Sequence, residues 1–226
     1  ILLLKGETSP GQPRTYRVKV EEASIPRVSR GVGIALEEGI DHEGQESCRI
    51  VTDTAAYYYH MQGAGLASLE DLDGQDWISY RPGGGSGGEY RGIPNMGHPE
   101  GYFHPGKLQS SSYVEARGPL RVRIRSESND GTWAGFWDFF PGYARLTLVR
   151  TSHPYWFLYE GTPGGKLDLG SDFCVRPGPR RLRRTSAAES WEADLMAPDQ
   201  PGEWVYFGDG KKVLYLVNHV DDSAVD

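Results

Sequence analysis

The sequence predicts an all-β protein organised as an antiparallel β-sandwich, either a jelly roll or a large twisted supersandwich. The chain contains 30 Gly and 15 Pro, too many for a helical protein but typical of short strands joined by turns. Several segments alternate apolar and polar residues with the period of two that a half-buried strand requires. Apolar residues at helical spacing are nearly absent, and no repeat typical of a propeller or solenoid is visible.

The first half of the chain is expected to contain strands at residues 16–20, 28–36, 48–60 and 77–80, and a hairpin around the Asp73-Gly74 turn within residues 65–76. Residues 48–60 give the strongest strand signal, because β-branched and aromatic side chains are dense there. At the end of this segment Tyr57 and Tyr59 share one face, and Tyr58 and His60 share the other. One pair is expected to face the core and the other solvent or a cleft, and the sequence leaves open which.

The second half is expected to contain strands at residues 112–116, 120–127, 143–150, 155–160, 204–207 and 213–218, with residues 133–140 ambiguous. Residues 120–127 alternate strictly, which predicts apolar side chains toward the core and charged side chains toward solvent. The glycine-rich residues 82–88 are expected to form a flexible spacer.

Residues 89–106 are expected to form a long irregular loop that carries the functional site. Three prolines and four glycines interrupt this segment, so neither a helix nor a central strand is expected there. Loops on rigid scaffolds frequently carry binding and catalytic residues. The alternative is an ordered loop whose polar side chains only satisfy backbone groups. The candidate residues within the loop are Arg91, Asn95, His98, Glu100, Tyr102 and His104.

The composition limits the classes of protein to consider. A length of 226 residues with 38% hydrophobic content suits one domain over residues 1–226. The formal net charge of −7 argues against nucleic-acid binding, which requires a basic face. The apolar residues 1–4 are too few to span a membrane or to act as a signal peptide. The start without Met suggests a processed N-terminus and is compatible with secretion.

Standard metal and nucleophile motifs are absent from the sequence. Cys48 and Cys174 fit no zinc spacing and are compatible with one disulfide or with two buried thiols. His98 and His104 also match no metal motif, so no metal cofactor is expected, although calcium is left open. No GxSxG segment occurs, which argues against a serine hydrolase.

Tyr, His and Arg side chains together fit one chemistry, the cleavage of a uronic-acid polysaccharide by β-elimination. The reaction requires a group that neutralises the substrate carboxylate, a base that removes the C5 proton and an acid that protonates the leaving oxygen. Arg91 suits the first role because its planar guanidinium binds a carboxylate through two bonds, and Asn95 would add a hydrogen bond. The candidates for base and acid are His104, His60, Tyr58 and Tyr102.

Other residues are candidates for holding a sugar. Aromatic rings stack on sugar faces, although most aromatic residues of a sandwich fill its core. Glu160 is a candidate carboxylate of a glycoside hydrolase, or a structural residue at the turn that follows it. Five arginines within residues 176–184 would attract a polyanionic glycan or form a solvated loop. The residues predicted to bind substrate are His98, Tyr102, Trp137, Tyr159 and Glu160.

Three segments resemble the central strands of galactose-mutarotase-like supersandwiches: GPLRVRI at 118–124, YARLTLVR at 143–150 and YWFLYEG at 155–161. The group includes polysaccharide lyase domains and sugar epimerases. The loop at 89–106 and the C-terminal residues 203–222 are similar to secreted bacterial proteins of carbohydrate-degrading systems. The resemblance implies a supersandwich fold, a secreted or periplasmic location, and an acidic polysaccharide or oligosaccharide as the partner.

We therefore expect a carbohydrate-active protein, as first choice a polysaccharide lyase acting on a uronic-acid glycan. The alternatives are a glycoside hydrolase that uses Glu160 with a second carboxylate, and a non-catalytic carbohydrate-binding module. A lyase requires an arginine and a His/Tyr pair near one sugar, whereas a hydrolase requires two facing carboxylates. A binding module requires only a flat strip of aromatic rings.

Overall fold

The computed structural model describes residues 33–78, 95–98, 101–103, 110–152, 156–159, 163–166, 168, 170–175, 183–184 and 204–218. Across these ranges the strand pairings are all antiparallel, and the helical content is the single 3-10 turn η1 (Pro163–Gly165). No helix in this part of the chain is long and apolar enough to cross a membrane. The prediction of an all-β, sandwich-like protein is confirmed.

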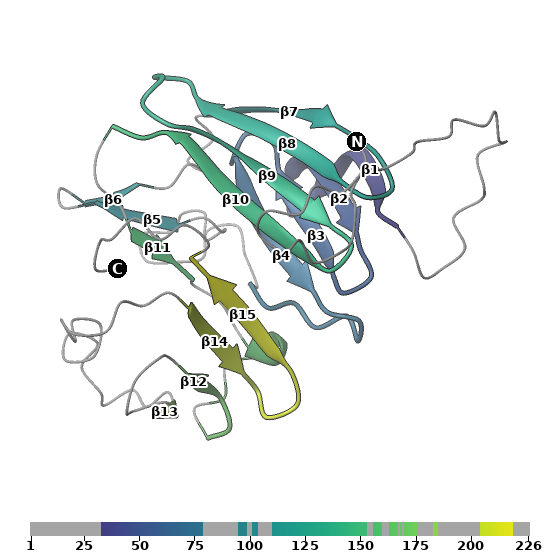
Figure 1. Ribbon diagram of the computed structural model, residues 1–226, viewed down its shortest axis with the longest axis vertical. Coiled ribbons are helices and arrows are strands. Elements are labelled where there is room, and N and C mark those ends of the chain that lie inside the picture. Colours follow the sequence, from purple (N-terminus) through teal and green to yellow (C-terminus); the bar gives the residue numbers. More distant parts are fainter. Residues whose placement is uncertain are drawn as a thin grey trace, which may run out of the picture.

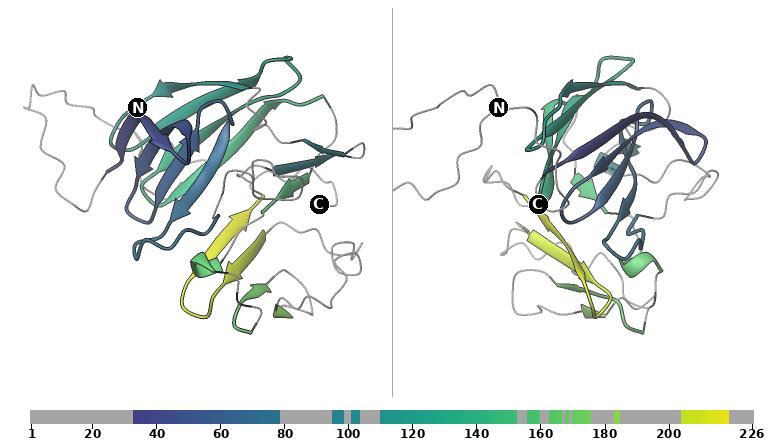
Figure 2. Two further views of the ribbon diagram at one scale, coloured as in Figure 1. Left: turned by 180° about the vertical axis from the view of Figure 1, so that it is seen from behind. Right: turned by 90° about the vertical axis from the view of Figure 1, so that its right-hand side faces the viewer.

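Two four-stranded sheets face each other (Figures 1 and 2). The β1–β4 sheet contains β1 (Ala35–His42), β2 (Gln45–Val51), β3 (Ala56–His60) and β4 (Gly65–Glu70). The β7–β10 sheet contains β7 (Ser110–Ala116), β8 (Val122–Ser128), β9 (Ala134–Phe140) and β10 (Tyr143–Arg150). In both sheets neighbouring strands are consecutive in the chain. This order is a meander and differs from the Greek-key order of a jelly roll.

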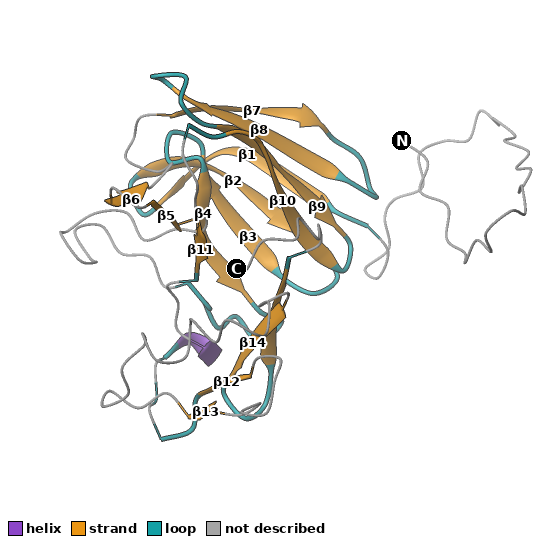
Figure 3. Ribbon diagram, turned by 60° about the vertical axis from the view of Figure 1, so that its left-hand side comes forward, coloured by secondary structure: helices purple, strands orange, loops and turns teal. Residues whose placement is uncertain are grey.

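Two smaller sheets lie outside this pair (Figure 3). One has the order β11-β5-β6 and contains β5 (Asn95–His98), β6 (Gly101–Phe103) and β11 (Trp156–Leu158). The other has the order β13-β12-β14-β15 and contains β12 (Phe173–Val175), β13 (Arg183–Arg184), β14 (Trp204–Gly208) and β15 (Val213–Val217). We call the second one the C-terminal sheet.

The core lies between the two large sheets and uses alternate residues of their central strands. The main buried cluster includes Cys48, Ile50, Tyr57, Tyr59 and Leu66 from the β1–β4 sheet and Val122, Ile124, Trp137 and Phe139 from the β7–β10 sheet. Rings meet across the interface, since the ring centroids of Tyr57 and Phe139 lie 5.2 Å apart. Burying one such side chain stabilises the fold by roughly 1.5–3 kcal/mol.

A buried chain of hydroxyl groups also joins the two sheets. The Tyr59 hydroxyl lies 2.6 Å from Ser126 Oγ, which lies 2.6 Å from Ser112 Oγ. Ser112 Oγ in turn donates to the carbonyl oxygen of Met61 at 2.6 Å. These bonds satisfy polar groups that would be costly to bury alone. Burial raises the pKa of the Tyr59 hydroxyl, so the chain is neutral at physiological pH.

The alternation predicted for residues 120–127 is confirmed. Val122 and Ile124 are buried in the core, whereas Arg121, Arg123 and Arg125 lie on the outer face of the β7–β10 sheet. Cys48 is a buried thiol whose sulfur lies 3.6 Å from Met61 Sδ, and burial raises its pKa to about 11. A buried thiol was one of the two alternatives left open by the sequence.

Several predicted segments differ from the structure. Trp77 and Ile78, at the start of the strand predicted at 77–80, lie in a bend, and β1 begins only at Ala35, near the end of the strand predicted at 28–36. Residues 48–60 are not one strand, because a turn at residues 52–55 separates β2 from β3. Thr52 Oγ1 accepts hydrogen bonds there from the backbone N–H groups of Thr54 and Ala55. Such local bonds from short polar side chains compete with the backbone hydrogen bonds of a strand. Residues 89–106 are not entirely irregular, because β5 and β6 form a hairpin within them. The predicted strand at 16–20 lies outside the described residues.

The C-terminal sheet is attached to the turn that follows β4. The Lys212 ammonium group lies 2.7 Å from an Asp71 carboxylate oxygen and 2.5 Å from one of Asp73. The Tyr159 hydroxyl donates a hydrogen bond to the Trp77 carbonyl oxygen at 2.5 Å. The Tyr159 ring packs against the Phe207 ring, with 4.7 Å between ring centroids. These contacts hold the C-terminal hairpin against the end of the sandwich.

Gly135 on β9 allows β10 and the Trp133 ring to approach closely. A Cβ atom there would lie 2.9 Å from the Thr147 carbonyl oxygen and 3.3 Å from both Leu148 Cδ2 and Trp133 Cζ2. We expect Gly135→Ala to lower the free energy of unfolding by about 1–3 kcal/mol. The added methyl group would push against the backbone of β10, which cannot move away without weakening its pairing with β9. Urea denaturation measures the change.

The matched control is Gly142→Ala in the turn between β9 and β10. A Cβ atom at Gly142 meets nothing within 4 Å, so its free energy of unfolding should change by less than about 1 kcal/mol. If the two variants lost equal free energy of unfolding, the close contacts at Gly135 would not be the cause of the loss in Gly135→Ala.

Candidate functional site

Three of the predicted site residues, Arg91, His104 and Glu160, lie outside the described residues. Three others lie on the β5–β6 hairpin, where the structure describes the backbone: Asn95 and His98 on β5, and Tyr102 on β6. In the register of the hairpin, Tyr102 pairs with Gly97 and His98 pairs with Gly101. The fold therefore brings these three candidates onto one short hairpin.

Trp137 and Tyr159 are placed where they hold the fold together. Trp137 is 6% exposed and stacks on Phe139 within the core, at 6.1 Å between ring centroids. Tyr159 is half-buried between the Trp77 backbone and the Phe207 ring, and burial raises its pKa. These placements argue against both residues as platforms for a sugar, and the burial of Trp137 is the usual position of an aromatic residue in a sandwich.

Tyr58 and His60 lie together on the outer face of the β1–β4 sheet. Their strand β3 directs Tyr57 and Tyr59 into the core, which turns the two intervening side chains to the opposite face. This arrangement resolves which of the two pairs faces inward. Tyr58 is half-buried, and His60 is 1% exposed although it lies outside the core.

His42 completes a cluster with these two residues. Its ring stacks on Tyr58 with 4.2 Å between centroids and an interplanar angle of 22°. The His42 and His60 centroids lie 5.7 Å apart. His42 Nε2 lies 2.9 Å from Ser68 Oγ on β4, so the His42 side chain reaches across β2 and β3. We call His42, Tyr58, His60 and Ser68 the His–Tyr cluster.

The β1–β2 hairpin positions His42. His42 pairs with Gln45 around a two-residue turn, in which Glu43 has φ 54° and Gly44 has φ 77°. Positive φ at both central residues is typical of the type I′ turn, which Gly adopts without strain. A bulge between Glu37 and Ile40 shifts the register before the turn, and such bulges redirect side chains at functional positions.

Burial keeps both histidines of the cluster uncharged at neutral pH. The pKa of His60 is lowered from 6.5 to about 4, mainly by desolvation and also by the nearby His42, while a hydrogen bond with the His42 backbone opposes the shift. Desolvation also lowers the pKa of His42, against the opposing effect of neighbouring carboxylates, of which Glu43 and Asp76 are the strongest. A neutral imidazole can accept a proton, which is the state that a general base requires.

Polar groups of both charges surround the exposed end of the cluster. The Tyr58 hydroxyl lies 3.5 Å from Glu70 Oε2, a long hydrogen bond. The Arg49 guanidinium carbon lies 5.8 Å from the centre of the Tyr58 ring, and Arg49 Nη1 is 4.0 Å from Glu37 Oε2. Arg49 is therefore a cation within reach of any substrate that contacts Tyr58.

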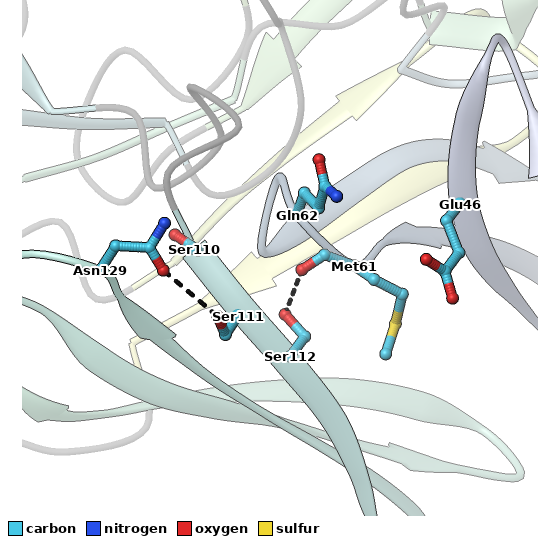
Figure 4. Close-up of a pocket in the computed structure, with 7 residues that line it drawn as sticks. All are labelled: Glu46, Met61, Gln62, Ser110, Ser111, Ser112 and Asn129. Carbon is cyan, nitrogen blue, oxygen red and sulfur yellow. Dashed lines mark hydrogen bonds between the residues drawn. The ribbon is translucent and has the colours of Figure 1, made fainter.

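A shallow pocket of about 360 Å³ lies elsewhere, where the β3–β4 turn meets the start of β7 (Figure 4). Its lining is mostly polar and comprises Glu46, Met61, Gln62, Ser110, Ser111, Ser112 and Asn129. Ser112 bonds to Met61 and Ser111 donates to Asn129 Oδ1 at 3.2 Å, as the dashed lines show. The pocket contains none of the predicted site residues.

No group of three or more His, Cys, Asp and Glu side chains arranged to bind a metal occurs within the described ranges. Comparisons with protein-family models, curated proteins and solved structures found no match for the chain. The functional argument therefore depends on the chemistry of the described residues.

Sequence reasoning missed His42, Arg49 and Ser68. His42 lies 16 positions before Tyr58 in the numbering, and Ser68 lies on a strand that is not adjacent to β1. The available signal was the Glu43-Gly44 pair between two alternating segments, which indicates a tight hairpin and would have placed His42 at a strand end.

Proposed function

We propose that this protein is a polysaccharide lyase that cleaves a uronic-acid glycan by β-elimination at the His–Tyr cluster. The observation that supports the proposal is the stacking of a neutral histidine, His42, on Tyr58 beside the cation Arg49. These are the three kinds of group that the reaction requires. Because acidic polysaccharides of this kind are extracellular, the proposal also implies a secreted or periplasmic protein.

Each residue has a role that its surroundings support. Arg49 binds the substrate carboxylate and makes the C5 proton more acidic. His42 accepts that proton, the C5–H electron pair becomes the C4–C5 double bond, and the C4–O bond breaks. Tyr58 donates its hydroxyl proton to the leaving oxygen. Proton transfer from His42 to Tyr58 through solvent then restores the starting state.

His60 and Ser68 act as positioning residues. Ser68 holds His42 Nε2 at 2.9 Å and so fixes the imidazole in its stack on Tyr58. His60 lies beneath the pair and is too buried to contact a polymer. Such supporting groups keep a catalytic pair within the narrow geometry that proton transfer demands.

The proposal predicts a measurable product. Incubation with alginate, pectate, glucuronan or a glycosaminoglycan should produce the ultraviolet absorbance of an unsaturated uronide. We expect Tyr58→Phe and His42→Gln each to lower kcat about a hundredfold or more, because each removes one proton-transfer group. Tyr58→Phe retains the ring that stacks under His42, so a loss of activity in this variant reports on the hydroxyl.

Leu72→Ala is the control, because Leu72 is an exposed side chain that lies outside the His–Tyr cluster. Its activity should equal that of the unmodified protein. If unsaturated product formed at the same rate in Tyr58→Phe and Leu72→Ala, the His–Tyr cluster would not be the catalytic site. If no double bond formed on any substrate, the lyase proposal would be wrong.

A specific observation supports a second candidate, the non-catalytic glycan-binding module. The C-terminal sheet presents three aromatic side chains, Trp204, Tyr206 and Tyr215. The Trp204 and Tyr206 rings are nearly parallel, with 6.1 Å between centroids and an interplanar angle of 8°. Trp204 also stacks on Tyr215, with 5.8 Å between centroids and an interplanar angle of 26°. Sugar rings bind to such flat strips. Binding of a neutral glycan that is abolished by Trp204→Ala, without any double-bond formation, would favour this candidate.

A further inference from the structure

The outer face of the β7–β10 sheet carries a regular array of arginine and aromatic side chains. The strand register places them in cross-strand rows. Arg125 pairs with Tyr113 on β7 and with Phe136 on β9, and Asp138 on β9 lies between Arg123 and Arg145. Members of such rows lie about 5 Å apart, so their side chains are neighbours. We call Arg121, Arg123, Arg125 and Arg145, with Tyr113 and Tyr143, the arginine face.

Asp138 organises the centre of this face. It is fully buried, and Arg123 contacts both of its oxygens at 2.7 Å through Nε and Nη2. Arg145 Nη2 donates to the same carboxylate at 3.1 Å. The Arg123 guanidinium carbon lies over the Phe136 ring, 3.8 Å from its centre. These contacts fix the Arg123 and Arg145 side chains before any ligand arrives, and fixed groups lower the entropic cost of binding.

The arginine face has an excess of positive charge. Its four guanidinium groups face two carboxylates, those of Asp138 and Glu115, so two positive charges are not compensated. At the margins of the same sheet, Arg150 pairs with Glu127 and Arg117 pairs with Glu38, and these pairs add no net charge. The excess is notable in a chain of net charge −7.

Two of the arginines retain donors for a ligand. Arg121 Nε is 3.6 Å from Asp138 Oδ1, and Arg125 Nη1 is 3.8 Å from Glu115 Oε1. Both distances are too long for hydrogen bonds. Within the described part of the chain neither guanidinium makes a hydrogen bond. Arg121 and Arg125 can therefore bind anionic oxygens without first breaking a hydrogen bond to a described residue. Because Arg121 Nε is buried, Arg121 would bind a ligand through its terminal Nη groups.

We propose that the arginine face is a second binding site, which docks an acidic polysaccharide away from the His–Tyr cluster. Arg121 and Arg125 are four residues apart along β8 and the residue that precedes it, which is roughly 13 Å, so an extended polymer several sugars long can contact both charges. Tyr113 and Tyr143, 55% and 56% exposed, offer rings for stacking at the two edges of the face. The two sites lie on different sheets, which form the two layers of the sandwich (Figure 2).

The charge of the face favours a polysaccharide over a nucleic acid. Nucleic-acid affinity depends on neutralising many closely spaced phosphates, which an excess of two charges in an acidic protein does not provide. A polyuronate carries fewer charges per unit length and offers apolar sugar faces to the tyrosines. That the docked polymer is a uronate depends on the proposed lyase function; that it is an anionic glycan depends only on the arginine face.

The test measures binding of full-length protein to alginate, heparin, neutral dextran and single-stranded DNA by affinity electrophoresis. The Arg121→Gln/Arg125→Gln double variant leaves the contacts of Asp138 with Arg123 and Arg145 intact. We expect it to lose roughly tenfold in affinity for the acidic glycans per arginine replaced, with no change for dextran. Affinity of the unmodified protein should fall as salt concentration rises.

The matched control is Arg117→Gln/Arg150→Gln, which removes the same charge from two already paired arginines of the same sheet. It should bind the acidic glycans within about twofold of the unmodified protein. Equal loss in both double variants, or unchanged binding in Arg121→Gln/Arg125→Gln, would overturn the proposal. Unchanged binding would instead direct attention to the arginines within residues 176–184. Tighter binding of DNA than of either acidic glycan would also overturn it.

The two proposals fail in different ways. Tyr58→Phe should bind acidic glycans as tightly as the unmodified protein, because Tyr58 is not on the arginine face. Glycan binding without double-bond formation would contradict the lyase function alone. Double-bond formation with unchanged binding in Arg121→Gln/Arg125→Gln would contradict the docking site alone.

Discussion

Asp138→Ala should lower the free energy of unfolding by about 3–5 kcal/mol. Asp138 is fully buried, and its carboxylate balances the charges of Arg123 and Arg145 on the adjacent strands. Burial raises the pKa of Asp138 but the guanidinium groups lower it more, so the net shift is downward and the carboxylate is ionised at neutral pH. Its removal leaves partly buried guanidinium groups facing one another without a counter-ion.

Chemical denaturation of Asp138→Ala beside Glu115→Ala provides the measurement. Glu115 contacts two arginines of the same face but is about one-third exposed, and solvent screens its ion pairs. Its replacement should cost about 1 kcal/mol or less. If the two variants lost equal stability, Asp138 would not be the centre that holds the arginine face in place.

Acidification should destabilise the protein through His60. Its pKa is about 4 in the folded state and 6.5 when unperturbed, so between these values the unfolded chain binds a proton that the folded protein does not. Stability contributed by the neutral histidine is therefore complete above pH 6.5 and falls as the pH decreases to about 4. The expected loss is about 3 kcal/mol. Urea titrations across this pH range measure it.

The control for this effect is His60→Gln, which retains a polar side chain but cannot titrate. The slope of stability against pH should largely disappear in that variant, whatever its overall stability. His42→Gln should retain most of the slope, although the lowered pKa of His42 contributes in the same direction. Asp71 and Asp130 have pKa values lowered to about 2, so their protonation affects stability only in a separate range below pH 3.8. An unchanged slope in His60→Gln would exclude His60 as its cause.

The fold class could be predicted because strand periodicity is local. Residues 120–127 alternate with the period of the pleat, and their apolar and charged faces lie where that pattern places them. The break between β2 and β3 was missed because Thr52, a good strand residue, instead bonds to the turn. The β5–β6 hairpin was missed because the prolines and glycines in and around these short strands obscure the strand pattern.

The candidate site could be predicted only in part, for reasons of distance along the chain. The grouping of Tyr58 with His60 follows from alternation alone. Their assignment to the outer face depends on the burial of Tyr57 and Tyr59 against the other sheet, which no local pattern encodes. The role of Asp138 could not be predicted for the same reason. The three arginines that contact it do not lie on its own strand: Arg121 directly precedes β8, Arg123 lies on β8 and Arg145 lies on β10.

The attachment of Lys212 to the turn after β4 has a consequence for biosynthesis. Lys212 and Asp71 are 141 residues apart, so their ion pair forms only after the ribosome has released nearly the whole described chain. Both sheets of the sandwich are complete by Arg150 and can pack while translation continues. Among the described elements the C-terminal hairpin is therefore the last to dock. A chain whose synthesis stops before this hairpin has both sheets of the sandwich but lacks Lys212 to pair with Asp71 and Asp73.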